Sequence, residues 1–494
     1  MDQKSLGNGD EGQWNGIEET IDDPEELRVI FCALDSFSQY AKTAHLNCTH
    51  FRRQAFYALP QAHWQMLAAP PFSYLKTLDR VDEAIESNAE LARTIVKYGL
   101  QSFGIIDAES DDPAKAPEPA AIPAEWAGIA KHQDLDKARS TIRQFYRDWS
   151  AEGAVERDAC YGPVYRALDA EKARRRRLQQ ERQQQRRQER QQTRQQQQQQ
   201  QQQSDQQQQQ HEEEDQEKPL KILVPGAGLG RLVFELCRRG FPTEGNEISY
   251  HQLLASSYIL NYSERVGQHT IYPWIHSFSN HRSRANQFRS YQIPDVHPQT
   301  ALQAQNQDRA QQQAQRQQQV EAKGEGEGEG GEEKEEGDAT TIGPIGSMQM
   351  CAADFLCLYG DDDHADAYDA VAAVFFLDTA PNLIRYLQVI RKCLRPGGVL
   401  INVGPLLWHW ENHVQGHPDG YDGRDEGDND DDLGIADPGS FELTDDEVMA
   451  LVERVGFVVE KRETDREAPY VQDPNSMLRT VYRASHWVAR KPET

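Results

Sequence analysis

The sequence predicts an α/β protein, in which a mainly parallel sheet with flanking helices follows a helical N-terminal region. Three observations predict this class. An apolar strand beginning at Lys221 runs directly into a glycine-rich turn, Gly226-Ala-Gly228-Leu-Gly230, the order found in nucleotide-binding βαβ units. The run from Tyr368 to Leu377 has the apolar composition of a buried parallel strand. The first third of the chain shows apolar residues at helical spacing.

The N-terminal helical region is expected to span residues 23–170, after an acidic, disordered tail at residues 1–22. Asp23-Pro24 fits an N-cap followed by proline at the first helical position. Apolar residues at helical spacing then predict one helix up to about Tyr40, a second between Leu78 and Val96, and a further helical stretch around Ser140 to Ser150.

Compositionally biased segments interrupt the rest of the chain. Residues 171–217 pass from Arg/Gln-rich to almost pure Gln with an acidic end, residues 299–341 pass from Gln-rich to Glu/Gly-rich, and an acidic loop occupies 417–434. Such compositions do not build a packed core, so we expect disordered inserts in an otherwise intact domain at 218–494. Arg174 to Arg177 could act as a nuclear-import patch, but a solvated basic run is the simpler interpretation.

Composition also limits the partners. The formal net charge of -27 argues against a general affinity for nucleic acid, although it leaves room for a local basic pocket. The seven cysteines form no CxxC pair, so the sequence predicts no metal site. No apolar stretch approaches the roughly 18 residues that span a bilayer. We therefore expect a cytoplasmic protein, with the nucleus as a further location, and leave a homodimer open.

The glycine-rich turn alone does not identify a cofactor. Such turns serve NAD, FAD and S-adenosylmethionine (SAM) alike, because glycine lets the backbone approach a ligand at the carboxyl end of the strand. Glu247 follows about 20 residues beyond Gly226, where a carboxylate hydrogen-bonds ribose hydroxyls in folds of this kind. That spacing also fails to separate NAD from SAM.

Three later features favour SAM. Asp354-Phe355 follows a short apolar segment, and an acidic and an aromatic residue there suit the adenine amino group and ring face. The strand from Tyr368 ends at Asp378. An amphipathic helix at 384–394 then runs into Arg395-Pro-Gly-Gly and another strand, a sequence common in class I SAM-dependent methyltransferases. The sequence therefore predicts that fold, which is Rossmann-like, for residues 218–494.

Methyl transfer from a sulfonium requires mainly that a neutral nucleophile be held in line and that water be excluded. Candidate substrate-facing residues are Asp378, His409 and Tyr482, with Glu411 beside them. Two have simpler interpretations: Asp378 could cap a helix beginning near Thr379, and His409, between two tryptophans, could be a packed surface histidine.

At these residues the sequence resembles the carnosine N-methyltransferase family, which transfers methyl from SAM to the imidazole of carnosine (β-alanyl-histidine) and forms anserine. The similar segments cover nearly all of the chain outside the tail and inserts: 44–47, 56–60, 140–150, 156–161, 223–231, 245–247, 272–276, 278–280, 294–296, 375–380 and 404–409. One departure is near the C-terminus, where Tyr482 stands alone in place of an aromatic cluster.

The resemblance implies a set of cofactor-binding residues: Gln144, Arg147, Gly226, Glu247, Asp354, Phe355 and Val374. Gln144 and Arg147 would reach the methionine carboxylate of SAM from the N-terminal helices, and a guanidinium suits that anion. Val374 stands where relatives often have cysteine, a change of little effect if only its backbone or small side chain meets the adenine.

The resemblance also implies that Asp378, His409 and Tyr482 contact a small dipeptide. An imidazole with a reference pKa of about 6.5 is mostly neutral at pH 7, so one ring nitrogen already offers a lone pair. The other ring N–H needs an acceptor, and Asp378 is the candidate. Two alternatives stay open: a methyltransferase acting on another histidine-containing peptide or protein, and a non-catalytic interaction protein with a relic SAM fold. A SAM-binding measurement would distinguish the relic, which should not bind SAM, from either methyltransferase, which should.

Overall fold

The computed structural model describes residues 24–105, 122–197, 219–307, 311, 346–411 and 439–493, with side chains in the long helix up to residue 189. The predicted tail at 1–22, the Gln-rich part of the first insert from 198 onward, residues 312–341 of the second insert and the acidic loop at 417–434 lie outside the described residues.

The core of the fold is a seven-stranded sheet in the order β5-β2-β1-β6-β7-β9-β8. Its strands are β5 (Met348–Ala352), β2 (Thr243–Glu247), β1 (Ile222–Pro225), β6 (Tyr368–Val374), β7 (Leu394–Gly404), β9 (Val481–Arg490) and β8 (Val458–Pro469). The first five are parallel, and β9 runs antiparallel to both of its neighbours. Because the chain moves outward from β1 to β2 and β5 and then crosses to β6, the order reverses between β1 and β6. This topology confirms the predicted class I methyltransferase fold.

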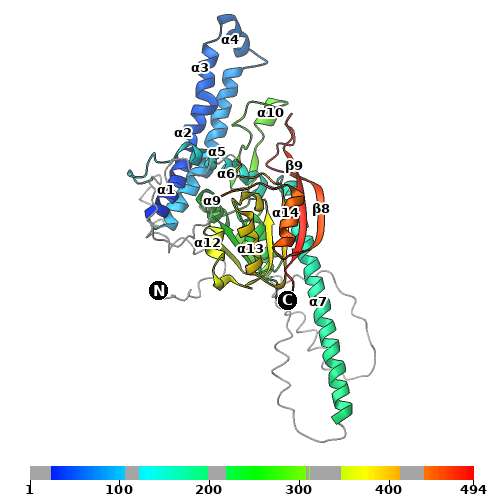
Figure 1. Cartoon of the computed structure of the whole chain (residues 1–494). Coiled ribbons are helices and arrows are strands. Elements are labelled where there is room, and N and C mark those ends of the chain that lie inside the picture. The colour runs from blue at the N-terminus through cyan, green and yellow to red at the C-terminus, as the bar shows by residue number, and fades with distance from the viewer. Residues whose placement is uncertain are drawn as a thin grey trace.

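Helices cover both faces of the sheet, which explains why β1 and β2 are buried throughout. Alternate residues point to opposite faces: Ile222 and Val224 join one hydrophobic cluster, and Leu223 joins the other. One face carries α12 (Phe355–Tyr359), α13 (Leu383–Cys393) and α14 (Asp445–Arg454) (Figure 1). The other face carries α8 (Arg231–Arg238), α9 (Tyr250–Ser257), a π-helical turn at Tyr258–Tyr262 and the N-terminal helices.

The N-terminal helices belong to the same hydrophobic core as the sheet. They are α1 (Pro24–Ser38), α2 (Tyr40–His45), a π-helical turn (Leu46–His50), α3 (Phe51–Tyr57), α4 (Gln61–Ala68), α5 (Tyr74–Ser102) and α6 (His132–Trp149). Helix α1 starts at the first described residue, Pro24, so the predicted cap at Asp23 is not tested, and the other expected helices correspond to α5 and α6. Helices α3 and α4 project with one end of α5 as an arm away from the body (Figure 1). A small sheet of β3 (His269–Ile271) and β4 (Tyr291–Ile293), with α10 (Arg284–Gln287), packs beside them.

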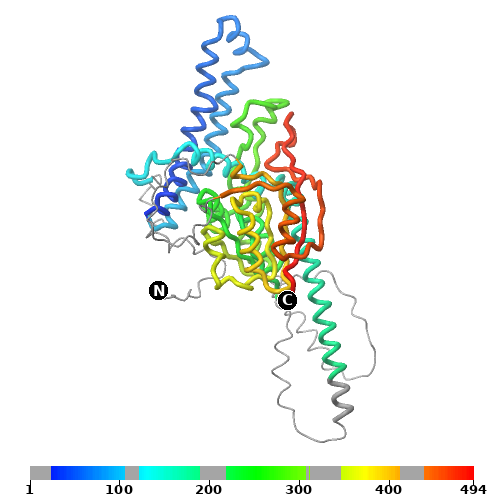
Figure 2. Tube along the Cα trace, viewed as in Figure 1, coloured from blue at the N-terminus to red at the C-terminus, as the bar shows by residue number. Residues whose placement is uncertain are grey.

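The first biased segment differs from its prediction. Helix α7 (Ala154–Gln197) continues without a break past residue 170, and Figure 2 shows it leaving the body of the protein. Glu171 is buried and bonds Arg174 and Arg175. Arginine and glutamine are good helix formers, and buried carboxylates neutralise the first arginines. The Arg-rich start of the predicted insert is therefore part of the packed fold.

Within the described residues, no helix has the length and apolar character that crossing a membrane requires.

Two histidines, the buried His251 and the half-buried His276, join the N-terminal helices to the rest of the core. His251 Nε2 lies 3.1 Å from Ser36 Oγ, and His276 Nε2 lies 2.7 Å from the hydroxyl of Tyr40. Burial lowers the pKa of His251 to about 4 and that of His276 to about 3. Both side chains are therefore neutral in the folded protein at pH values where a solvated histidine is charged.

We expect the stability of the fold to decrease as the pH falls below about 6.5. Below that pH the unfolded chain binds protons at these histidines and the folded chain does not, so the free energy of unfolding falls until the folded pKa is reached. At pH 5 the loss is on the order of 2 kcal/mol for each histidine. Urea unfolding of the wild type and of His251→Gln at pH 7.5 and pH 5 measures it.

The variant should lose less stability between the two pH values than the wild type does. His63→Gln, which changes an exposed histidine, is the matched control and should behave as the wild type. An equal loss in all three proteins would contradict the assignment.

Candidate active site

The glycine-rich turn at the carboxyl end of β1 requires glycine at two positions. Gly226 and Gly228 have φ of +64° and +58°, a region that side-chain-bearing residues rarely adopt. A Cβ atom on Gly226 would lie 2.9 Å from Cδ2 of Phe376, and one on Gly228 would lie 3.3 Å from Nε2 of Gln144. The turn is therefore enclosed by the segment that follows β6 on one side and by α6 on the other.

Glu247, the last residue of β2, is bonded to this turn. One carboxylate oxygen accepts from the backbone N–H of Gly228 at 2.9 Å, and the other accepts from Ile248 at 3.0 Å and Ser249 at 2.9 Å. Burial raises the pKa of Glu247, and the three N–H donors oppose that rise. A carboxylate has about four acceptor positions, so Glu247 can still accept from a ligand hydroxyl.

Gln144 of α6 lies over the same turn. Its Nε2 donates to Asp148 at 3.0 Å, and its Oε1 accepts from Nε2 of Gln252 in α9 at 2.8 Å. Oε1 of Gln252 is buried with no hydrogen-bond partner among the described residues. The amides therefore leave one acceptor unsatisfied next to Gly228.

Arg147, one turn further along α6, is a buried cation. Its residue is 5% exposed, and its Nε–H has no hydrogen-bond partner in the described part of the chain. Burial acts to lower the pKa of Arg147, but Tyr161 and Asp148 more than offset this and raise it above the usual value. The nearest carboxylate oxygen in an ion pair, on Asp148, is 3.9 Å from Nε. A buried guanidinium with an unsatisfied donor suits an anionic ligand.

Aromatic rings surround this guanidinium. Its Cζ is 4.9 Å from the ring centre of Tyr470 and 5.2 Å from that of Phe375. Tyr482 of β9 packs against both rings, at 5.9 Å from Phe375 and 6.2 Å from Tyr470. Phe375 follows β6 directly and has a φ of +55°, a strained conformation for a large side chain. We call Phe375, Tyr470 and Tyr482 the aromatic wall.

Asp378 and His409 come together beyond the ends of β6 and β7. Asp378 is 3% exposed; its Oδ2 accepts from the N–H of Leu407 at 2.9 Å, and its backbone carbonyl accepts from the N–H of His409 at 3.1 Å. Burial raises the pKa of Asp378, and the Leu407 N–H and His409 oppose that rise. Helix α13 is capped by Asn382, so the helix-cap interpretation of Asp378 is wrong.

Comparison with known proteins identifies the family. The family model for carnosine N-methyltransferase matches residues 124–185, 176–313 and 335–493. The chain belongs to the carnosine N-methyltransferase family. It is 28% identical to the carnosine N-methyltransferase of Mus musculus over 476 residues, 96% of this chain and 89% of the mouse protein. It is 29% identical to that of Schizosaccharomyces pombe over 473 residues, 95% of this chain and 97% of the yeast protein.

Solved structures are more distant. A SAM-dependent methyltransferase from Methanosarcina mazei is 12% identical with a TM-score of 0.27, covering 56% of this chain and 95% of that one. The 1,6-didemethyltoxoflavin-N1-methyltransferase of Burkholderia thailandensis is 14% identical with a TM-score of 0.24, covering 56% and 72%.

As a member of the carnosine N-methyltransferase family the protein is a SAM-dependent methyltransferase, and the predicted cofactor is confirmed. The unsatisfied groups fit the amino-acid part of SAM. The Nε–H of Arg147 can donate to the carboxylate, and Oε1 of Gln252 can accept from the ammonium group. Gly226 and Gly228 leave space where a Cβ would otherwise lie.

Asp354 and Phe355, the two residues predicted to frame the adenine, have different surroundings. Asp354 caps α12, its Oδ1 accepting from the N–H groups of Leu356 and Cys357 at 2.7 and 3.1 Å. Phe355 is 3% exposed, with Tyr359, Phe376 and Tyr386 each 5.3 Å from its ring centre.

The expectation that the ring of Phe355 offers a face to the adenine is therefore wrong, because aromatic neighbours in the core surround that ring. Val374 ends β6 and is half-buried.

Sequence reasoning missed three residues of the site. Tyr470 and Phe375 complete the aromatic wall, and Gln252 supplies the unsatisfied acceptor. Phe375 was detectable as the residue just after a buried strand, where parallel sheets bind ligands. Tyr470 and Gln252 carry no local signal. Among the described residues, no three His, Cys, Asp or Glu side chains converge as metal ligands.

Replacing Arg147 by lysine should weaken SAM binding about tenfold or more, because an ammonium keeps the charge but loses the planar fork, and a hydrogen bond to a charged group contributes roughly 1.5–3 kcal/mol. Isothermal titration with SAM gives the dissociation constants. Arg139→Lys on the same helix, at a side chain that is 48% exposed, should stay within about twofold of wild type. Equal weakening in both variants, or none in Arg147→Lys, would exclude the assigned role.

Proposed function

We propose that this protein transfers the methyl group of SAM to a ring nitrogen of the imidazole of carnosine and thereby forms anserine. The relatives named carnosine N-methyltransferase, similar over nearly the whole chain, support this substrate. The observation that carries the proposal is a buried carboxylate, Asp378, held beside His409 where the parallel strands β6 and β7 end. That edge of an α/β sheet is where such folds bind ligands.

The chemistry needs an acceptor at this point. SAM supplies, when bound, a methyl group on a positively charged sulfur. A neutral imidazole attacks with the lone pair of one nitrogen, so that a nitrogen–carbon bond forms while the carbon–sulfur bond breaks and its electron pair stays on sulfur. The product ring is a cation until the other nitrogen loses its proton. Asp378 accepts a hydrogen bond from that N–H, fixing the tautomer before transfer and stabilising the cation afterwards.

The remaining residues assist this step. The aromatic wall excludes water and presents ring faces that favour a cation. His409 is exposed at the rim, with its backbone bonded to Asp378 at 3.1 Å, and offers the dipeptide a second polar contact. Trp410 fixes the same loop through a bond from its Nε1 to the carbonyl of Thr379 at 3.0 Å.

Transfer of labelled methyl from SAM to carnosine by the purified protein tests the proposal. Asp378→Asn should lower kcat by about 10²-fold or more, because an amide cannot hold the charge that stabilises the imidazolium. Asp363→Asn, at an exposed carboxylate, is the matched control. If a histidine-containing peptide is labelled and carnosine is not, the substrate is a larger peptide and not the dipeptide. If SAM binds but neither compound is labelled, the proposal that an imidazole is the methyl acceptor is wrong.

Asp378→Asn should also preserve or raise the thermal stability at pH 7.5. The folded pKa of Asp378 is above its unfolded value, so this residue favours the folded state most at acid pH and loses that contribution as the pH rises. The amide oxygen can still accept from Leu407 N–H. Melting temperatures at pH 7.5 and pH 4.5 should show an advantage of the variant at the higher pH only, and a variant several degrees less stable than wild type at pH 7.5 would contradict it.

A further inference from the structure

A pocket lies at the ends of the parallel strands opposite to the active site. Its volume is about 720 Å³, within the range of ligand pockets. Helix α7 forms one side, and the residues that begin β1, β6 and β7 form the other, together with the end of α8. These are the amino ends of the parallel strands, whereas the glycine-rich turn, Glu247 and Asp378 lie at their carboxyl ends.

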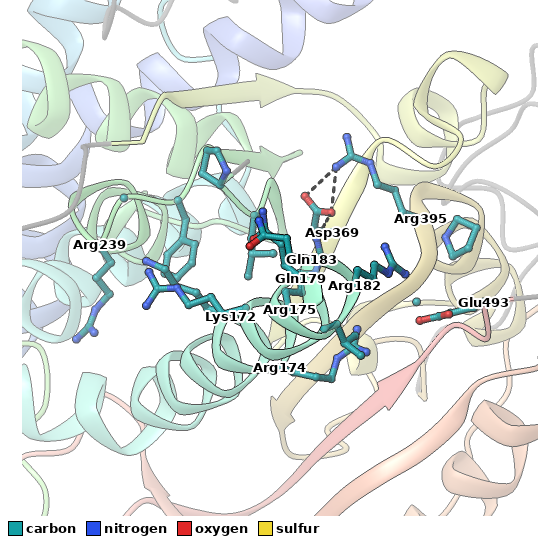
Figure 3. Close-up of a pocket in the computed structure, with 18 of the residues that line it drawn as sticks. Lys172, Arg174, Arg175, Gln179, Arg182, Gln183, Arg239, Asp369, Arg395 and Glu493 are labelled. Atoms are coloured by element: carbon teal, nitrogen blue, oxygen red, sulfur yellow. Dashed lines mark hydrogen bonds and ion pairs between the residues drawn. The ribbon is translucent and has the colours of Figure 1, made fainter. Parts of the chain in front are cut away.

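The pocket is strongly basic on a chain whose net charge is -27. Helix α7 contributes six cations: Lys172, Arg174, Arg175, Arg176, Arg182 and Arg186. Arg239 and Arg395 add two from the opposite side, and the acidic side chains in the lining are Asp369 and Glu493. Figure 3 shows Lys172 near Arg239, with Arg175 and Arg395 on either side of Asp369.

The inner cations are already paired. Asp369 is 2% exposed and bonds Arg175 at 2.7 Å and Arg395 at 2.9 Å. The outer ones differ: within the described ranges, no carboxylate pairs with Lys172, Arg182 or Arg239. Their positive charge therefore faces the pocket without compensation.

The shape and lining favour a carboxylate-rich peptide over nucleic acid. From Lys172 to Arg186 the basic side chains follow about 21 Å of helix, at 1.5 Å per residue, which suits an extended chain of charges. Single-stranded nucleic acid also needs aromatic faces for its bases. Phe241 is 4% exposed, and the guanidinium of Arg239 lies 3.7 Å from the ring centre of the nearby Tyr165.

We propose that this pocket binds the acidic run Glu212–Glu217 of the same chain. The run carries five carboxylates, and Asp215 precedes by four residues Pro219, which lines the pocket. Since a chain spans at most about 3.6 Å per residue, Asp215 lies within about 14 Å of Pro219.

The next acidic run, 332–338, has a looser tether. Its last carboxylate, Asp338, precedes Gly346 by eight residues, and Gly346 lies beside Phe241 in the described fold. A tether of eight residues reaches at most about 29 Å. Because the effective concentration of a tethered group falls with tether length, the first run has the advantage. Its carboxylates neutralise the like charges along α7, which repel one another at i, i+4 spacing, and they exclude other polyanions from the pocket.

Carbodiimide cross-linking of the full chain tests the occupant directly, because it joins a lysine amine to a carboxylate only where the two are in contact. Mass spectrometry should find Lys172 joined to Glu212, Glu213, Glu214 or Asp215. Lys172→Arg keeps the charge but removes the amine, and should abolish that product. Joining of Lys172 to residues 332–338, or to neither run, would overturn the proposal.

Competition gives a second measurement. Replacing the five carboxylates of 212–217 by amides should increase the affinity for a fluorescent hexaglutamate peptide at least tenfold, and adding Lys172→Gln and Arg182→Gln should remove the increase. The matched control replaces the five carboxylates at 332, 333, 335, 336 and 338, with the same change in net charge, and should stay within twofold of wild type. Equal increases in both charge variants would mean a general charge effect, and no increase in either would mean that the pocket does not bind this run. Neither experiment measures methyl transfer, so both are independent of the proposed function.

Discussion

The site depends on one ion-pair network centred on Asp295, in which both arginine partners are buried. Its carboxylate bonds Arg157 at 2.9 Å and Arg231 at 2.5 Å. Arg231 opens the helix after the glycine-rich turn and also donates to the carbonyl of Asp148 at 3.0 Å, while the N–H of Asp295 donates to the carbonyl of Trp149 at 2.8 Å. Removing one partner of such a pair leaves an uncompensated buried charge, at a cost of about 3–5 kcal/mol. The network joins α6, α7 and the turn into one unit, and so sets where Gln144 and Arg147 lie over Gly228.

Around this unit the two ends of the parallel strands carry opposite kinds of chemistry. At the carboxyl ends of the strands, buried carboxylates and one buried cation have their pKa values shifted by desolvation and by neighbouring charges. The strained backbone of Phe375 and the unsatisfied polar atoms of Arg147 and Gln252 also lie there. Such features are common at ligand-binding sites, where the ligand supplies the missing hydrogen bonds. At the amino ends, surplus positive charge gathers along α7. A chain with a large net negative charge thus separates a cofactor site from a basic pocket by the length of its parallel strands.

Local sequence patterns were sufficient for much of the fold. The apolar strand before Gly226, the spacing to Glu247 and the run ending near Asp378 follow from short-range rules, because burial on both faces and the turn geometry impose composition on neighbouring residues. The same rules fail at α7: a run with few apolar residues predicts no packed structure, yet Glu171 and Asp369 hold its arginines by ion pairs. Charge pairing with a distant strand leaves no periodic trace in the sequence.

The sequence by itself determined the class I methyltransferase fold and the choice of SAM, since those rest on short motifs, and it determined the family through the resemblance of many segments to known members. Only the tertiary structure decided how the site is enclosed. It put Tyr470 beside Tyr482 and next to Arg147, which lies more than 300 residues earlier in the chain. It buried the ring of Phe355 in the core and tied Asp378 to the loop after β7 rather than to a helix. Contacts of that kind depend on how whole elements pack, and packing is a property of the folded chain that no short segment carries.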